Sequence, residues 1–403
     1  MITSTMPAGD AAAGAPTYVP RAGYLPFCVP AIGEEEIAEV VDTLRSPWIS
    51  TGPKTQRLQT EFAALVGAAS AVAVNSGTAA LHTALAALGV GPGDEVITTT
   101  MTFVSSVNVI EHVGATPRLV DVEPDTLNLS VAEVERALTP RTRVIIPVHF
   151  AGHPVEMDPL LELARAHGIE VVEDAAHALP ATYRGRPIGA GPNPVCFSFY
   201  ATKNMTTGEG GMVTGSPDFI EAARIFSLHG MSRDAWKRYD RTGSWFYEIV
   251  LPGFKYNMTD IQASLGLSQL RKLGAFAARR RAIVARYNAA FGVDELETPV
   301  ERAGVESAWH LYVLRLRPDT LRIDRNRFVD ELKLRNIGTS VHFIPVHRHP
   351  YYRQTLGLAP GDLPVANDAF ERMLSLPLHP LLLDTDVDDV IGAVLDVVAT
   401  FRR

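Results

Sequence analysis

The stretch AVAVNSGTAALHTALAALGVGPGDEVITTT, residues 71–100, decides the fold class. Its apolar run at 71–74 predicts a strand, which is followed by a helical pattern over about residues 78–88. A second strand ends near Thr100 and precedes a helix over about residues 104–112. The same alternation continues through PRLVDV, VAEVERAL, RVIIPVH, PLLELARAH and IEVVED, within residues 117–174. Alternation at this period indicates crossover connections, so we predict an α/β protein with a largely parallel sheet flanked by helices.

Length and composition indicate an ordinary globular protein. The chain has 403 residues, of which 46% are hydrophobic and 20% are charged. This length exceeds that of a usual single domain, so we expect one large domain and one smaller one. A formal net charge of −8 argues against a nucleic acid partner, because phosphate backbones are bound by clustered Lys and Arg. No apolar run approaches the roughly 18 residues that span a bilayer, so we expect no membrane partner.

The cysteines and the N-terminal residues bear on location. Cys28 and Cys196 are too few for a disulfide framework, which suits a cytoplasmic protein. Neither is expected to be catalytic, and Cys196, in the apolar run VCFSFY, should be a small buried hydrophobe. The first residues lack the basic start and apolar core of a signal peptide. We therefore expect residues 1–22 to form a flexible arm, 23–270 a large cofactor-binding domain and 271–403 a small domain.

Further helices and strands follow from periodicity. GEEEIAEVVDTLRS, at 33–46, predicts a helix with Ile37, Val40, Val41 and Leu44 on one stripe. Residues 258–291 predict a long amphipathic helix that links the two domains. In the second domain we predict strands in WHLYVLRLR and GTSVHFI, and closing helices near residues 364–374 and 386–400.

A second stretch, DAAHALPATYRGRPIGAGPNPVCFSFYATKNMTTGEGG at 174–211, carries the main candidates for chemistry. Asp174 ends the predicted strand IEVVED and Lys203 follows the strand in VCFSFY, and ligands gather at the carboxyl ends of parallel strands. A lysine among apolar and glycine residues has a lowered pKa and can hold an aldehyde cofactor as an imine. A pyridine ring acts as an electron sink only while a carboxylate keeps its nitrogen protonated. Lys203 and Asp174 therefore predict bound pyridoxal 5'-phosphate.

Other candidates depend on this pair. NSGT, at 75–78, lies between a strand and a helix, where backbone N–H groups attract phosphate, although a serine there is also a common N-cap. Phe103 is a candidate to stack on the cofactor ring, with core packing as the alternative. His177 is a candidate to contact the ring oxygen, with a structural role as the alternative. The candidates for holding the phosphate are Ser76, Gly77, Thr78 and Ser198.

A pair of histidines suggests a metal, but the pattern does not favour one. His149 and His153 are four residues apart in HFAGH. Pro147 and Gly152 break any helix that would align the two side chains, and no third ligand stands at a familiar spacing. We therefore predict no metal site.

Nine segments, in order along the chain, resemble the DegT/StrS family of pyridoxal phosphate-dependent sugar aminotransferases. They are WISTGP, NSGTAALHTAL, GDEVITTTMTFVSSVNVI, GATPRLVDVEPDTLNL, PVHFAGHPVEMDPL, VEDAAHALPATYRGRPIG, FSFYATKNMTTGEGGMV, HGMSRDAW and FKYNMTDIQASLGLSQL. The resemblance runs from about Tyr24 to the C-terminus, where GTSVHFIPVHRHPYYR and LSLPLHP also match. Within the family, TKNMTTGEGG, EDAAHA and FKYNMTDIQA look most like members that aminate a 4-keto nucleotide sugar.

The resemblance implies a fold and residue roles. It implies the fold type I of pyridoxal phosphate-dependent transferases, with a mostly parallel seven-stranded sheet and a smaller C-terminal α+β domain. Lys203 would form the imine, Asp174 would pair with the pyridine nitrogen and His177 would contact the ring oxygen. Gly77, Thr78 and Ser198 would hold the phosphate. Asn257 would reach the phosphate of the neighbouring subunit, so the protein would be a homodimer with shared active sites.

The resemblance also implies a reaction. L-glutamate would convert the cofactor to pyridoxamine 5'-phosphate and leave as 2-oxoglutarate, and a nucleotide-linked keto sugar would then accept the amine at C4. Many family members have Gln at the position of His177, and the most similar subgroup often has Trp at the position of Phe103. These departures bear on substrate identity rather than on reaction type.

Several alternatives remain open at this point. The sugar ketone could lie at C3, and some relatives that use a histidine in place of the imine lysine are sugar dehydratases, which Lys203 argues against. A cofactor-binding regulator without turnover and a metal-dependent hydrolase built on His149 and His153 are further alternatives. A nucleotide diphosphate needs cations, and the candidates are Lys237, Arg238, Arg241, Arg233 and His347. For Lys237, Arg238 and Arg241 the alternative is a solvated charged loop.

Overall fold

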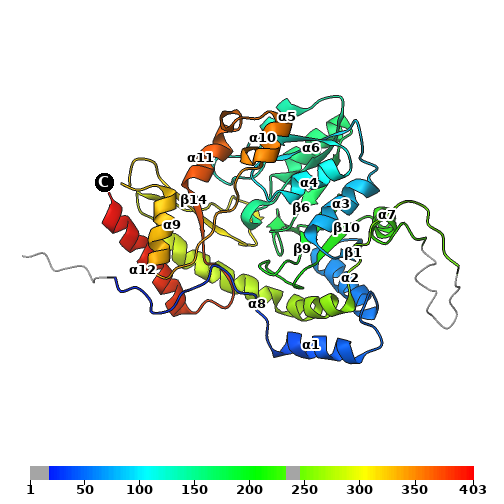
Figure 1. Cartoon of the computed structure of the whole chain (residues 1–403), viewed down its shortest axis with the longest axis horizontal. Helices are drawn as coiled ribbons and strands as arrows, with labels where there is room; N and C mark the ends of the chain where they lie inside the picture. The colour runs from blue at the N-terminus through cyan, green and yellow to red at the C-terminus, as the bar shows by residue number, and fades with distance from the viewer. Residues whose placement is uncertain (1–17, 233–245) are drawn as a thin grey trace, which may run out of the picture.

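The computed structural model describes residues 18–232 and 246–403 (Figure 1). The predicted N-terminal arm is described only from residue 18, and there Arg21 Nη1 lies 3.0 Å from Asp386 Oδ1. Four of the candidate cations lie outside the described residues, namely Arg233, Lys237, Arg238 and Arg241.

A mostly parallel sheet forms the centre of the larger part of the molecule. Two ladders, β3-β2-β4-β5 and β1-β10-β9-β6, meet where only Val172 separates β5 from β6. The sheet is continuous there because Val148 bridges Asp174, whose N–H donates to Pro147 O at 2.9 Å. With β5 and β6 taken as one interrupted strand, the described residues form the predicted seven-stranded sheet. Its strands are β1 Ser70–Val74, β2 Glu95–Thr99, β3 Thr116–Val120, β4 Thr142–Ile146, β5 Glu170–Val171, β6 Glu173–Asp174, β9 Val195–Ser198 and β10 Gly211–Gly215.

One strand runs against the others. Neighbouring strands are parallel from β3 through β2, β4 and β5, and again between β6 and β9. Strand β10 is antiparallel to both β9 and β1. The connection between β9 and β10, residues 199–210, therefore begins and ends at the same edge of the sheet. This connection carries Lys203.

The sheet is buried on both faces. Ile97 and Phe197 pack in one hydrophobic cluster, whereas their chain neighbours Val96 and Cys196 pack in another, because successive side chains of a strand point to opposite faces. Cys196 is 1% exposed, as expected for a small core residue. The helices of this part are α2 Pro53–Val66, α3 Gly77–Ala87, α4 Ser105–His112, α5 Val131–Ala137, α6 Met157–His167 and α7 Pro217–Ser227.

Helix α1, Glu34–Arg45, has an unusual orientation. It packs on the long helix α8, Asp260–Ala290, but the side chains that it buries there are polar. Glu36 is fully buried and accepts hydrogen bonds from Gln269 Nε2 at 3.0 Å and Lys272 Nζ at 2.9 Å. The predicted apolar stripe faces outward instead, with Ile37 49% and Leu44 58% exposed.

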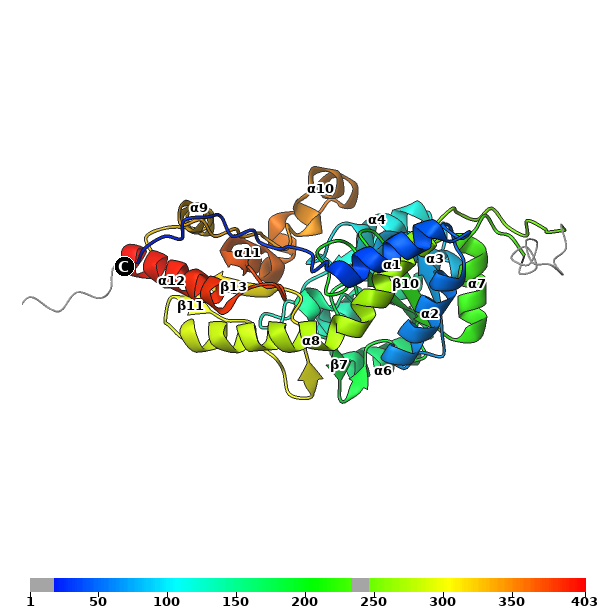
Figure 2. The ribbon, with the colours of Figure 1, turned by 90° about the horizontal axis from the view of Figure 1, so that it is seen from below.

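Helix α8 and the segments that follow it build the smaller part of the molecule. Figure 2 shows α8 extending from the large sheet to α12, as the predicted linking helix does. A three-stranded sheet, β11-β13-β14, packs with α8, α9 and α12 in one hydrophobic cluster. The elements are β11 Leu296–Glu297, β13 Tyr312–Leu316, β14 Met373–Leu376, α9 Arg325–Leu334, α10 Pro350–Leu356, α11 Pro364–Arg372 and α12 Asp384–Phe401. The boundary at residues 270 and 271, which falls inside α8, stays a prediction.

The strand predicted in GTSVHFI is wrong. Residues 338–344 form only one bridge, in which Ser340 pairs with Ser375 of β14. Beyond that bridge the backbone no longer pairs with β14, although His342 Nδ1 lies 2.9 Å from Ser375 Oγ, and His342 and Phe343 line a cavity next to the large sheet. The remaining short strands, which form a separate sheet, are β7 Thr182–Tyr183, β8 Arg186–Pro187 and β12 Val305–Glu306. In the part of the chain that the structure describes, no helix combines the length and apolarity of a membrane span.

Candidate active site

A cavity of about 500 Å³ lies where the carboxyl ends of the strands meet the smaller part of the molecule. It is lined by eight of the nine residues that the sequence predicts for the site. The smaller part contributes His310, His342 and Phe343 to the same wall. The eight predicted residues in the lining are Ser76, Gly77, Thr78, Phe103, Asp174, His177, Ser198 and Lys203.

Lys203 enters the cavity from the connection between β9 and β10. Its backbone N–H donates to Tyr200 O at 2.9 Å, which forms a tight turn after β9. Burial lowers the pKa of the Lys203 ammonium to about 8, and the attraction of Asp174 opposes this shift only in part. A neutral amine is therefore accessible near neutral pH, as covalent chemistry with an aldehyde requires.

Asp174 ends β6 and is 4% exposed. Its Oδ2 accepts a hydrogen bond from Ser106 Oγ at 2.7 Å, and its Oδ1 accepts one from the Ala176 N–H at 3.0 Å. Each oxygen keeps a further lone pair, because a carboxylate has about four acceptor positions. The carboxylate can therefore take an additional N–H donor from a ligand.

The N-terminus of α3 and the end of β9 form a close-packed cradle. A Cβ atom on Gly77 would lie 2.8 Å from Ser198 Cβ, so only glycine permits this approach of the two segments. The first N–H groups of a helix have no partner within the helix, and together with the Ser198 hydroxyl they form a donor set for an anion. Ser76 Oγ accepts from the Ala79 N–H at 3.0 Å, so its side chain serves as the N-cap. This bond uses only an acceptor position of the hydroxyl, so the Ser76 O–H remains available as a donor to a phosphate, together with the backbone.

Aromatic and imidazole rings form another part of the cavity lining. His177 lies between Phe343, at a centroid distance of 5.7 Å and an angle of 20°, and His310, at 4.3 Å. Burial lowers the pKa of His177 and of His310 well below the usual value, so both rings are neutral. Phe103 is 59% exposed and lines the cavity, so core packing does not explain it. A neutral His177 and an exposed aromatic ring suit contact with a flat heterocycle.

These observations test whether pyridoxal phosphate fits the site. An amine with a lowered pKa, a buried carboxylate with free lone pairs, an anion cradle and an exposed aromatic face all line one cavity. His177 Nδ1 is buried without a hydrogen-bond partner among the described residues. The donor and acceptor set therefore matches an aldehyde, a pyridine nitrogen and a phosphate on one molecule.

Asn257 does not line the cavity of its own chain. Its Nδ2 donates to Thr51 Oγ1 at 2.7 Å, and its Oδ1 accepts from Lys255 Nζ at 2.5 Å. His347, a candidate for binding a diphosphate, is fully buried, and its Nδ1 lies 2.7 Å from Thr100 Oγ1. His347 is therefore not placed to meet a ligand in the cavity.

The ring nitrogens of His149 and His153 are engaged in the protein interior. His149 Nε2 lies 3.0 Å from Glu173 Oε2, and its Nδ1 accepts from the Val155 N–H at 3.0 Å. His153 Nδ1 lies 2.8 Å from Pro154 O, and its Nε2 accepts from the Arg302 N–H. These contacts explain both residues as structural.

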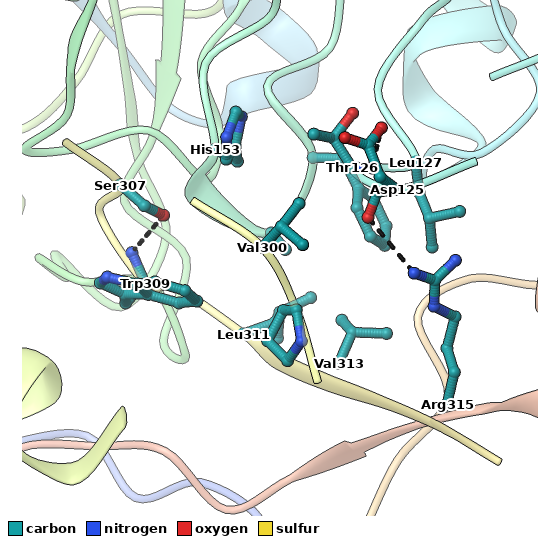
Figure 3. Close-up of a pocket in the computed structure, with 13 residues that line it drawn as sticks. Asp125, Thr126, Leu127, His153, Val300, Ser307, Trp309, Leu311, Val313 and Arg315 are labelled. Carbon is teal, nitrogen blue, oxygen red and sulfur yellow. Dashed lines mark hydrogen bonds between the residues drawn. The ribbon is translucent and has the colours of Figure 1, made fainter. Parts of the chain in front are cut away.

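A second, smaller cavity lies beside His153 and Arg315 (Figure 3). Its volume is about 30 Å³, which is room for water molecules rather than for a coenzyme. Trp309, in its lining, has φ of 45° and donates its N–H to Ser307 Oγ at 3.1 Å (Figure 3). This cavity does not compete with the larger one as a site for chemistry.

Comparison with known proteins identifies the family. Residues 30–395 match the model of the DegT/DnrJ/EryC1/StrS aminotransferase family. The chain is 52% identical over 384 residues to the uncharacterized protein MJ1066 of Methanocaldococcus jannaschii, and the aligned region covers 95% of this chain and 100% of that protein. It is 51% identical over 381 residues to the spore coat polysaccharide biosynthesis protein SpsC of Bacillus subtilis, which covers 94% of this chain and 98% of that protein.

Solved structures of sugar aminotransferases have the same fold as this chain. The pyridoxal phosphate form of the putative sugar aminotransferase Spr1654 from Streptococcus pneumoniae superposes with a TM-score of 0.87 at 40% identity, over 94% of this chain and 99% of that chain. Its pyridoxamine phosphate form gives the same TM-score. The predicted fold type, enzyme class and cofactor are confirmed. The chain therefore belongs to the DegT/DnrJ/EryC1/StrS aminotransferase family and is a pyridoxal phosphate-dependent sugar aminotransferase.

Proposed function

We propose that the protein transfers the amino group of L-glutamate to the C4 ketone of a nucleotide-linked deoxy sugar, which forms a 4-amino sugar nucleotide. The observation that carries this proposal is the presence of Lys203, Asp174 and the Gly77–Ser198 cradle around one cavity. The volume of about 500 Å³ leaves space for a sugar beside a coenzyme. The name of SpsC, a polysaccharide biosynthesis protein, supports a sugar product.

Each residue of the site would have its own role in the reaction. Bound pyridoxal phosphate supplies an electron sink for the carbon that carries the transferred nitrogen. Lys203, with a pKa of about 8, would move a proton between the substrate carbon that carries the nitrogen and the exocyclic carbon of the cofactor. Asp174, fixed by Ser106 and Ala176, would hold the pyridine N–H. His177 would contact the ring oxygen, and Phe103 would cover one face of the ring.

Phosphate binding would use groups from several elements. The backbone N–H groups of Gly77 and Thr78, at the start of α3, and the Ser198 hydroxyl would hold the phosphate in one subunit. Asn257 would complete the site of the neighbouring subunit. Its position outside its own cavity, between Thr51 and Lys255, supports this assignment.

The outward apolar stripe of α1 supports a homodimer with shared sites. Ile37, Val41 and Leu44 of this stripe, and Ile49 in the segment that follows α1, are each more than a third exposed, and exposed apolar side chains of this kind are typical of a subunit interface.

The two free cysteines suit a reducing cytoplasm, which we propose as the location.

A substrate panel tests the proposal. Nucleotide 4-keto and 3-keto sugars are incubated with the enzyme and L-glutamate, and mass spectrometry detects the amino sugar. We expect amination of a 4-keto substrate and no product with Lys203→Ala, whose fold circular dichroism should report as unchanged. Amination of 3-keto sugars alone would move the reaction to C3. A cofactor absorption band that does not respond to glutamate would instead favour a regulator without turnover.

A further inference from the structure

The hydroxyl of Ser106 connects two parts of the active site. Ser106 Oγ lies 2.7 Å from Asp174 Oδ2 and 2.8 Å from Thr102 Oγ1, and both hydroxyl-bearing residues are buried, at 0% and 2% exposure. An ionised carboxylate can only accept hydrogen bonds, so Ser106 must donate to Asp174. Thr102 is then the donor to Ser106. The hydrogen bonds therefore run in one direction, from Thr102 through Ser106 to Asp174.

Ser106 also closes the turn that presents Phe103. Its backbone N–H donates to Phe103 O at 3.3 Å, in the first turn of α4. Phe103 itself is 59% exposed at the cavity. Ser106 thus contacts the backbone of Phe103 through its own backbone and the Asp174 carboxylate through its side chain.

The Asp174 carboxylate is fixed from two sides. Ser106 bonds Oδ2, and the Ala176 N–H bonds Oδ1 at 3.0 Å. Rotation of the carboxylate would break both bonds, and hydrogen bonds to a charged group are among the stronger ones in proteins. Without the Ser106 hydroxyl only the bond from Ala176 would remain, and the carboxylate could rotate about that one contact.

We propose that Ser106 is a positioning residue for the cofactor, because it fixes the Asp174 carboxylate relative to the turn that carries Phe103. A pyridine ring stacked on Phe103 would then meet the carboxylate at its nitrogen edge. This inference rests on the proposed roles of Asp174 and Phe103. Ser106 does not line the cavity, so it would act on the cofactor through Asp174.

The test measures cofactor binding by the full-length protein, independently of turnover. Apoenzyme variants are titrated with pyridoxal phosphate, and the dissociation constant and the pH dependence of the visible absorption band are recorded. We expect Ser106→Ala to weaken binding by about 10- to 100-fold, the range for one hydrogen bond to a charged group, and to displace the pH profile of the band. Ser106→Thr, which keeps the hydroxyl, should restore both properties. Thr102→Val should give a smaller loss in the same direction.

Ser264→Ala is the matched control, because Ser264 is a buried serine whose Oγ donates only to Ile261 O within α8. Its affinity and band should equal those of the wild type. Wild-type binding and an unchanged band in Ser106→Ala, together with weakened binding in Asp174→Asn, would overturn the inference and leave the proposed function intact. Unchanged binding in Asp174→Asn would remove the proposed role of Asp174 as well. If Ser106→Ala does not fold, Thr102→Val decides by the same readouts.

Discussion

The ring of His310 lies 4.3 Å from the ring of His177, although His177 follows strand β6 of the large sheet and His310 precedes β13 of the smaller part. His310 Nδ1 is 3.0 Å from Asn204 Oδ1, and Asn204 Nδ2 donates to Ala308 O at 2.8 Å. The second bond fixes the orientation of the Asn204 amide, so Nδ1 of His310 must carry the proton. The residue after Lys203 thereby sets the tautomer of a ring in the cavity wall.

We predict that His310→Phe keeps the ring contact with His177 but lowers the free energy of unfolding by about 1–3 kcal/mol, because it leaves the buried Asn204 oxygen without a donor. Urea denaturation measures this loss. The loss of stability caused by His310→Phe should be smaller when it is measured in an Asn204→Leu background, because the Asn204 oxygen is then absent both before and after the change. Equal stability of wild type and His310→Phe would show that the Asn204 contact contributes nothing.

The lowered pKa of Lys203 predicts how cofactor uptake depends on pH. Only the neutral amine is a nucleophile, and a pKa of about 8 makes about one molecule in eleven competent at pH 7, against about one in three thousand at the ordinary lysine value of 10.5. Uptake of pyridoxal phosphate by the apoenzyme, followed by absorbance, should therefore accelerate as pH rises and level off above about pH 8. A rate that keeps rising tenfold per pH unit up to pH 10 would contradict a lowered pKa.

Gly77→Ala should disrupt phosphate binding specifically. The added Cβ would lie 2.8 Å from Ser198 Cβ, so the start of α3 and the end of β9 must separate. We expect the dissociation constant for pyridoxal phosphate to rise by about 10-fold or more, as expected when anion donors are displaced. Gly274→Ala is the matched control in α8, because nothing lies within 4 Å of its new Cβ. Equal weakening in both variants would point to a general effect on the fold.

The outward stripe of α1 predicts a change of assembly. Leu44→Glu places a charge in the proposed subunit interface, and we expect the dimer dissociation constant to rise by about 10-fold or more. Analytical ultracentrifugation over a concentration series measures it. Leu334→Glu, at a similarly exposed leucine in α9, should leave assembly unchanged. A monomeric wild type would remove the proposal of shared sites.

Much of the fold and part of the site could be predicted because both depend on local patterns. The strand and helix periods near residues 71–112 placed α3 and α4 within a residue of their observed starts. Asp174 and Lys203 were predicted because Asp174 ends a strand and Lys203 lies in the connection after another, and strand ends of a parallel sheet share one edge.

The residues that sequence analysis missed come from long-range packing. Ser106 meets Asp174 across 68 positions of sequence, and His310 of the smaller part meets His177, which follows β6 of the large sheet. Nothing in the local pattern of GTSVHFI indicated that His342 and Phe343 leave the sheet for the cavity wall. The direction of the α1 stripe was likewise invisible, because periodicity defines a face without saying what covers it.

The antiparallel course of β10 restricts how this enzyme can vary. Ser198 pairs with Gly211, so residues 199–210 are tethered at both ends by neighbouring strands. A slip of one position would turn every β10 side chain to the opposite face, so an added or removed residue would have to be accommodated within the connection itself. Such a change would move the turn at Lys203 relative to Asp174, and we therefore expect natural change in this segment to favour substitutions over changes in length.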